Sequence, residues 1–253
     1  MHPHLELHHI RAVLTRLEET IIFALVERAQ FRVNARIYMP GGVAIPDFTG
    51  SFVDYLLRGT EMLHATVRRY TSPDEHPFFE GLPASLLPPL CYDAPIAPSR
   101  VNINARIKQV YEQEIIPLFC APGDDQQYGS SAVCDVTCLQ ALSKRIHYGK
   151  FVAESKFRQD ETRYRAMIAR GNHDELYAAI TDTAVEARLL ERVGRKAAAY
   201  AREIDSAQNP DGTRAAQIMY KLDPALVTRL YQTWIIPMTK DVEVEYLLAR
   251  QPA

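Results

Sequence analysis

Residues 143–157 read SKRIHYGKFVAESKF, a stretch with no proline, one glycine and regularly spaced apolar residues. This pattern is typical of a helix. At about 100° per residue, Lys156 returns to within about 20° of Arg145 on the helix surface, about three turns further on. Gly149 and Val152 lie between the two cations and are small. The stretch therefore predicts a helix whose small, apolar face has a cation at each end, which suits a small anion with several polar groups. Alternatively, both cations form ion pairs with neighbouring helices.

Helical periodicity extends through most of the chain, and no segment shows the alternation of a strand. Pro237 should kink the last helix, and Asp47 or Thr49 could cap the second one. The sequence predicts an all-α fold, a single domain over residues 1–253 packed as a bundle with several long helices. The predicted helices span about 5–31, 50–70, 103–119, 131–157, 160–170, 173–181, 182–204 and 223–250.

Two segments interrupt this pattern. Residues 72–99 contain seven of the sixteen prolines, which predicts an ordered but irregular crossing with a turn of helix near 84–87. Residues 122–130 are rich in Gly, Asp and Gln, and predict a loop that ends at the serines before the long helix.

The composition excludes several classes of protein. The chain has 253 residues, is 47% hydrophobic and 24% charged, and carries a net charge of -2, so it has no electrostatic footprint for nucleic acid. It has no apolar run long enough to span a membrane and no visible secretory signal, so we expect no membrane partner and a cytoplasmic location. The four cysteines form no CxxC pair; free thiols are expected, with a disulfide or metal site as the alternative.

Further polar residues occur in pairs at helical spacing. Asp182 and Glu186 are four residues apart, and so are Thr239 and Glu243. Arg11 lies beside the apolar stripe of the first helix. Each residue by itself is typical of a solvated helix face or a cap. Together with the two cations of 143–157, they form the polar set needed to bind an oxygen-rich dianion between helices.

Four segments carry a resemblance to a known family. They are IRAVLTRLEETIIFALVERAQF (10–31), GSFVDYLLRGTEMLHATVRRYTSPDEHPFF (50–79), YGSSAVCDVTCLQALSKRIHYGKFVAESKF (128–157) and IIPMTKDVEVEYLL (235–248). Over essentially its whole length, the chain resembles the helical chorismate mutases of fungi and plants. The resemblance implies the rearrangement of chorismate to prephenate for phenylalanine and tyrosine biosynthesis, without a metal or redox cofactor.

The resemblance also implies roles for the polar residues. Arg145, Lys156 and Glu243 would be the catalytic residues. Lys156 and a protonated Glu243 would donate hydrogen bonds to the ether oxygen, where negative charge develops. The expected substrate-binding residues are Arg11, Thr239, Glu186 and Asp182: the first two for carboxylates, the last two for the ring hydroxyl. The well-known fungal members have asparagine where Asp182 stands, so the contact of Asp182 stays open.

Regulation and assembly are implied less specifically. Relatives of this size are homodimers, and many bind tyrosine or tryptophan at the subunit interface. The matching positions are Arg68 and Arg69, in ATVRRY, and Gly129 and Ser130, before the long helix. Arginines can bind the carboxylate of an amino acid, and a helix N-terminus adds free N–H groups. Adjacent arginines at a helix end also favour the helix dipole without any ligand, so a response to effectors stays open.

Three alternatives remain at this stage. The chain could be a non-catalytic relative on the same scaffold, although Arg145, Lys156 and Glu243 are all present. It could be an unrelated helical binding module whose charges form structural salt bridges. It could also be a plastidic or secreted enzyme whose leader has been removed.

Overall fold

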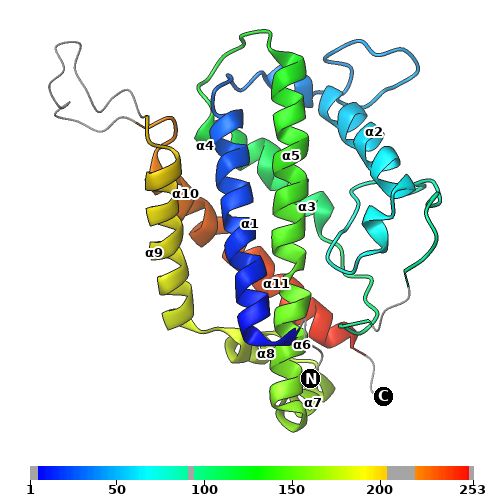
Figure 1. Ribbon diagram of the computed structural model, residues 1–253, viewed down its shortest axis with the longest axis vertical. Coiled ribbons are helices and arrows are strands. Elements are labelled where there is room, and N and C mark those ends of the chain that lie inside the picture. Colours follow the sequence, from blue (N-terminus) through cyan, green and yellow to red (C-terminus); the bar gives the residue numbers. More distant parts are fainter. Residues whose placement is uncertain (1–4, 91–93, 204–219, 251–253) are drawn as a thin grey trace, which may run out of the picture.

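The computed structural model describes residues 5–90, 94–203 and 220–250, and these residues form an assembly of helices (Figure 1). Within them there is no strand, only two isolated bridges. The predicted all-α fold class is confirmed. The helices are α1 (Leu7–Arg28), α2 (Phe52–Thr66), α3 (Asn104–Val110), α4 (Ile116–Phe119), α5 (Tyr128–His147), α6 (Gly149–Gln159), α7 (Glu161–Arg170), α8 (His173–Ile180), α9 (Thr183–Tyr200), α10 (Pro224–Leu230) and α11 (Ile236–Ala249).

The helices α5 and α6 form a nearly continuous rod. Tyr148, the one residue between them, keeps right-handed helical dihedrals of φ -62° and ψ -13°. In Figure 1 this rod runs down the length of the molecule with α1 packed beside α5. The predicted long helix is therefore confirmed, although it begins at Tyr128, so that Gly129 and Ser130 belong to its first turn rather than to the loop.

Two longer helices each contain one π-helical turn. Tyr111–Ile115 joins α3 to α4, and Tyr231–Ile235 joins α10 to α11. Each π turn ends two residues before a helical proline, Pro117 or Pro237. Proline has no N–H to donate and its ring collides with the carbonyl one turn earlier. A local change to wider π bonding accommodates this. The disturbance predicted at Pro237 thus takes the form of a π turn.

Side-chain caps define the starts of the three helices that follow α6 in the chain. Asp160, Asn172 and Asp182 accept hydrogen bonds from backbone N–H groups in the first turns of α7, α8 and α9 respectively. Gly171 ends α7 with a left-handed φ of 63°, which glycine adopts without strain. These helices were predicted with closely similar bounds, because the sequence places a capping residue before each one.

The prediction for the start of the second helix was wrong. Ser51, rather than Asp47 or Thr49, caps α2, and it forms a capping box with Asp54. The reciprocal bonding of two side chains and two backbone groups outweighs a single cap further upstream. Asp47 instead has a φ of 59° and belongs to the preceding turn.

The irregular crossing between α2 and α3 contains no helical turn at 84–87, so that part of the prediction was wrong as well. A buried carboxylate holds the beginning of the crossing in place. Glu61 on α2 accepts hydrogen bonds from the backbone N–H groups of Phe78 (2.8 Å) and Phe79 (3.0 Å). The crossing is thus held in place through its backbone. Neither the spacing of apolar residues nor the composition of the sequence indicates this arrangement.

Two predictions drawn from composition can be compared with the described residues. Among these residues, no helix is long and apolar enough to cross a membrane. Cys120 and Cys138 are buried free thiols and Cys134 is a half-buried one. Cys91 lies outside the described residues.

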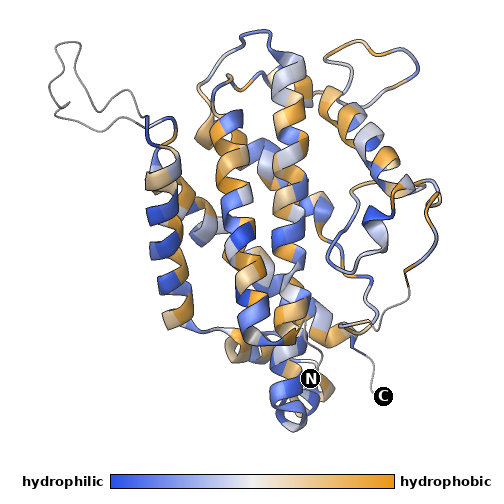
Figure 2. Ribbon diagram, viewed as in Figure 1, coloured by the Kyte–Doolittle hydropathy of each residue, from blue (hydrophilic) through white to orange (hydrophobic). Residues whose placement is uncertain are grey.

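Apolar side chains fill the space between helices, while outer faces such as that of α9 are hydrophilic (Figure 2). Within this core, Arg28 and Asp135 form a fully buried ion pair, with Nε and Oδ1 2.6 Å apart. The hydroxyl groups of Tyr38 and Tyr111 also donate to the Asp135 carboxylate, at 2.8 and 2.7 Å. The pair links α1 to α5, and all of its charge is compensated within the protein.

We expect Asp135→Asn to lower the free energy of unfolding by about 3–5 kcal/mol, because it leaves the Arg28 charge buried without a counter-ion. Urea denaturation followed by circular dichroism measures this. Glu191→Gln is the matched control: it removes the partner of Arg195 from an exposed pair on α9, which should change stability by less than about 1 kcal/mol. Equal effects of the two variants would contradict a central role for the buried pair.

Candidate active site

The site is built where α6 and α11 come into close contact at Gly149. A Cβ atom at this position would lie 2.8 Å from the carbonyl oxygen of Thr239 and 3.1 Å from its Cγ2. It would also lie 3.3 Å from Cγ of Glu243. Only glycine fits this gap. The small floor predicted between Arg145 and Lys156 is therefore where the backbone of α6 meets α11.

Lys156 and Glu243 face each other across this contact. Lys156 Nζ lies 2.9 Å from Glu243 Oε2 and also donates to the carbonyl oxygen of Ile180, the last residue of α8, at 2.7 Å. The Glu243 side chain is only 6% exposed, whereas that of Lys156 is 27% exposed. The pair therefore links α6, α8 and α11 at one point, with the lysine on the more open side.

Burial raises the pKa of Glu243 above its usual range. The positive charges of Lys156 and Arg145 oppose this shift without cancelling it. A carboxyl group in such surroundings is more readily protonated than one in water, and the protonated form can donate a hydrogen bond.

Arg145 is a buried cation that forms no ion pair with a carboxylate of the described residues. It is only 3% exposed, its one hydrogen bond is a long 3.4 Å contact with Thr239 Oγ1, and its Nε has no partner among the described residues. No carboxylate of the described chain forms an ion pair with it. Thr239 Oγ1 itself donates to the carbonyl oxygen of Ile235 at 2.6 Å. An unpaired buried charge is costly, so this site has the electrostatics of a receptor for an anion.

Arg145, Lys156, Thr239 and Glu243 form a polar cluster. Lys240 also belongs to this cluster, although it was not identified from the sequence. Its Nζ lies 3.0 Å from Glu186 Oε1 and 4.6 Å from the ring centre of Tyr177. Burial lowers the pKa of Lys240, but the hydrogen bond and negative charge of Glu186, together with the contact with Tyr177, outweigh burial, so that the pKa is raised. The feature of the sequence that could have identified Lys240 is its position in IIPMTKDVEVE, directly after Thr239.

Two predicted residues are not joined to the cluster by any described contact. Asp182 is exposed and its side chain caps α9, accepting from the N–H of Val185 at 3.0 Å. Arg11 is exposed on α1 and forms no hydrogen bond or ion pair with the described residues. Its neighbour Ile10 does pack into the same apolar cluster as Phe151, which places this part of α1 alongside α6.

The four predicted effector residues fall into two separate groups. Arg69 bonds to Glu75 and to Gln140 of α5, both at 3.1 Å, and Arg68 donates to the carbonyl oxygen of Pro88. Gly129 and Ser130 are exposed in the first turn of α5. The eleven residues from Gly129 to Gln140 correspond to about 16 Å along the helix axis. Within one chain the two groups therefore do not surround one small ligand.

Comparisons with known proteins agree with this geometry. Residues 127–244, which include most of the cluster, match the family "Chorismate mutase type II". The chorismate mutase of Emericella nidulans is 47% identical over 255 residues, covering 97% of this chain and 92% of that protein. The chain belongs to the chorismate mutase family. The chloroplastic chorismate mutase 1 of Petunia hybrida is 48% identical over 245 residues, covering 95% of this chain and 74% of that protein.

Solved chorismate mutases have the same fold. The Candida albicans enzyme in complex with L-Trp has a TM-score of 0.88 and 39% identity, covering 97% of this chain and 92% of that one. The chorismate mutase AtCM1, with phenylalanine bound in its allosteric site, has a TM-score of 0.87 and 44% identity, covering 98% of each chain. This chain is accordingly a chorismate mutase, an isomerase of aromatic amino acid biosynthesis.

We expect Gly149→Ala to destabilise the mutase by about 1–3 kcal/mol, because the added methyl group forces α6 away from α11. In an unobstructed helix the same change stabilises by about 1 kcal/mol. Gly194→Ala on α9 is the control, since its Cβ would meet only the Thr228 hydroxyl, which can rotate away. Thermal unfolding of both variants measures the difference. A stable Gly149→Ala protein would show that the helices are not in close contact.

Proposed function

We propose that residues 1–253 form a single catalytic domain in which this cluster binds chorismate in its compact, reactive shape. Extended conformers of the substrate dominate in water, so catalysis consists first of holding the two reacting ends together. The observation that carries this assignment is Arg145, a buried guanidinium group with no carboxylate partner among the described residues. A substrate carboxylate would supply the missing negative charge.

Each polar part of the substrate has a partner of suitable chemistry. Arg145 and Thr239 would bind one carboxylate, since a guanidinium group can meet a carboxylate with two parallel bonds. Arg11, which forms no hydrogen bond or ion pair with the described residues, would reach the other carboxylate from α1. Glu186 would accept the ring hydroxyl, held ready for this by Lys240. The Asp182 carboxylate already caps α9, so we assign it a smaller role than Glu186 in binding the ring hydroxyl.

The chemical step would be stabilised at the ether oxygen. Negative charge grows on this atom as the C–O bond breaks, and Lys156 and protonated Glu243 would donate to it from two sides. Fixed donors aimed at developing charge typically contribute about 3–4 kcal/mol each. In the free protein the two side chains bond to each other, so the substrate would separate a pair that is already in position.

The pH dependence tests the role of Glu243. Because Glu243 must be protonated to donate, we expect kcat/KM to fall as the pH rises through its raised pKa. Glu243→Gln should remove this fall, since an amide donates at every pH, so its activity at high pH should exceed that of the parent. Steady-state loss of chorismate between pH 5 and 9 measures both profiles.

Arg145→Lys provides a control for this experiment, because it weakens carboxylate binding without changing the titrating group. It should lower kcat/KM at every pH and keep the shape of the parent profile. A parent profile that is flat over this range would refute the proposed role of Glu243.

The remaining alternatives are less favoured by the contacts described above. A non-catalytic relative has no need for a buried, unpaired arginine, and a purely structural module would pair its charges as Arg28 and Asp135 do. We propose a cytoplasmic location, as expected from the sequence. The plastid is the alternative, because some relatives are chloroplastic.

We further propose that the enzyme is a homodimer that pairs through α2. One face of this helix and the crossing beside it expose large apolar side chains, with Leu63 68% and Leu86 83% exposed. Tyr55, Met62 and Val67 extend the same surface. An apolar surface of this kind on a chain of this size favours burial against a second copy.

An aromatic amino acid is the proposed effector. The related structures hold L-Trp, or phenylalanine in an allosteric site. The two groups of predicted effector residues are about 16 Å apart in one chain, so a single effector would have to join Arg68 and Arg69 of one subunit to Gly129 and Ser130 of the other. Dimerisation would then be a condition for regulation.

We expect Leu63→Glu to convert the dimer to a monomer, because it places a charge in the middle of the apolar α2 face. Sedimentation velocity measures the mass, and chorismate turnover with and without each aromatic amino acid measures the response, which should be lost with the dimer. Phe23→Glu, an equally drastic change at an exposed position of α1, should leave the mass unchanged. A Leu63→Glu dimer, or a monomer that still responds, would contradict the model of an effector at the interface.

A further inference from the structure

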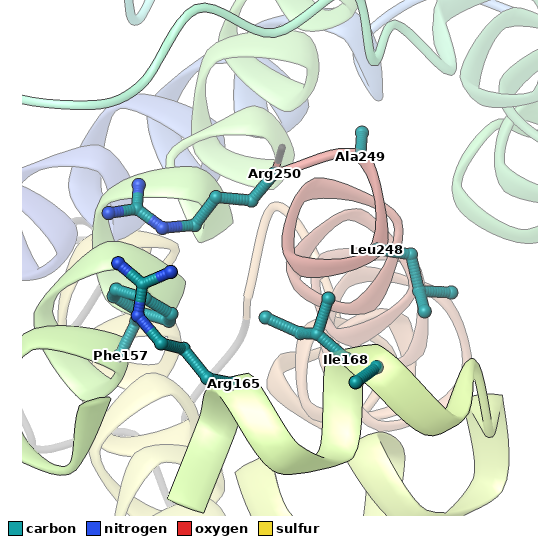
Figure 3. Close-up of a pocket in the computed structure, with 7 residues that line it drawn as sticks. Phe157, Arg165, Ile168, Leu248, Ala249 and Arg250 are labelled. Carbon is teal, nitrogen blue, oxygen red and sulfur yellow. The ribbon is translucent and has the colours of Figure 1, made fainter. Parts of the chain in front are cut away.

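A pocket of about 320 Å³ opens at the end of the molecule where the last turns of α6, α7 and α11 meet (Figure 3). This volume is at the lower end of the range for small-molecule sites. None of the residues assigned to chorismate lines it. The pocket is lined by Phe157, Arg165, Ile168, Ala169, Leu248, Ala249 and Arg250.

Two guanidinium groups gather at one end of this pocket. Arg165 of α7 and Arg250, just after α11, both lie over the ring of Phe157, with Cζ 5.7 Å and 3.9 Å from the ring centre. Figure 3 shows both side chains extending towards the same side, one above the other. Two cations that share one aromatic ring repel each other unless an anion lies between or beside them.

The carboxylates nearby do not balance this positive charge. Glu161 pairs with Arg165 at 2.6 Å, and the fully buried Glu154 is shared by Arg250 at 2.8 Å and Arg158 at 2.7 Å. Among the described residues, three arginines thus face two glutamates, which leaves one positive charge in excess at the rim of the pocket. A monoanion would complete the balance.

The other side of the pocket is apolar. Ile168 and Leu248 lie across from the guanidinium groups in Figure 3, and Ala169 and Ala249 complete this wall. We propose that the pocket binds a small organic monocarboxylate, whose carboxylate contacts Arg165 and Arg250 and whose hydrocarbon body lies against Ile168 and Leu248. Both parts of such a ligand find complementary chemistry in one cavity of the right size.

This site is separate from the catalytic cluster but shares its helices. Phe157 directly follows Lys156 in sequence, so the two side chains project from α6 about 100° apart. Glu154, the partner of Arg250, accepts a hydrogen bond at 2.6 Å from Tyr246 of α11, one turn after Glu243. A ligand held between Arg165 and Leu248 would therefore connect α7 to the two helices that carry the catalytic pair.

Methyl NMR of the full-length enzyme tests the proposal, with 3-phenylpropionate as the probe. We expect the methyl signals of Ile168 and Leu248 to shift and to saturate in the millimolar range. The matched neutral alcohol, 3-phenylpropanol, should bind at least about tenfold more weakly, because it cannot form charge-assisted bonds. These local signals distinguish the pocket from any binding of the probe near Arg145.

Three variants define the outcome. Arg165→Gln should weaken the probe about tenfold, and Ile168→Glu should abolish binding by placing a negative charge in the wall. Arg195→Gln, which removes an exposed arginine of α9, should change nothing. The proposal is overturned if the Ile168 and Leu248 signals do not move, if the alcohol binds as well as the acid, or if Arg165→Gln binds like the parent.

Discussion

Gly149 lets α6 lie against α11 at a distance where any side chain would collide with the Thr239 carbonyl oxygen. Everything at the site depends on this contact. It places Lys156, two turns along α6, within 2.9 Å of Glu243, and it covers the carboxyl group enough to raise its pKa. If the two helices were further apart, water would enter, the carboxyl would ionise and the pair would become an ordinary surface ion pair.

The second constraint is electrostatic. Burying Arg145 without a carboxylate partner among the described residues costs stability, and an anion bound beside it would remove this cost. The π turn at Tyr231–Ile235 ends at the residue immediately before α11, about one turn before Thr239. The irregular backbone therefore lies next to the polar cluster. The hydroxyl of the buried Tyr231 likewise has no partner among the described residues. Two buried polar groups without a partner among the described residues, Arg145 Nε and the Tyr231 hydroxyl, thus belong to the part of the molecule where we propose that the substrate binds.

Sequence reasoning reached the helices and most of the cluster, because both depend on periodicity. Arg145 and Lys156 follow from their eleven-residue spacing along the rod of α5 and α6, and Thr239 and Glu243 from their four-residue spacing on α11, which packs against that rod. The features that sequence reasoning missed depend on tertiary contacts, which leave no periodic pattern in the sequence. The role of Lys240 is set by Glu186 and Tyr177 on other helices, and the anchoring of the crossing by Glu61 is invisible in composition.

The two buried arginines of the fold separate structure from function. Arg28 donates to Asp135, to the Tyr38 hydroxyl and to several backbone carbonyl oxygens, so its charge is fully compensated by the protein. Arg145 is just as buried, yet the described residues give it one long contact with a threonine. Burial and charge are equal in the two cases, and only the supply of partners differs. A buried cation whose partners are complete belongs to the fold, whereas a buried cation that lacks a carboxylate partner among the described residues is where we propose that the negatively charged substrate binds.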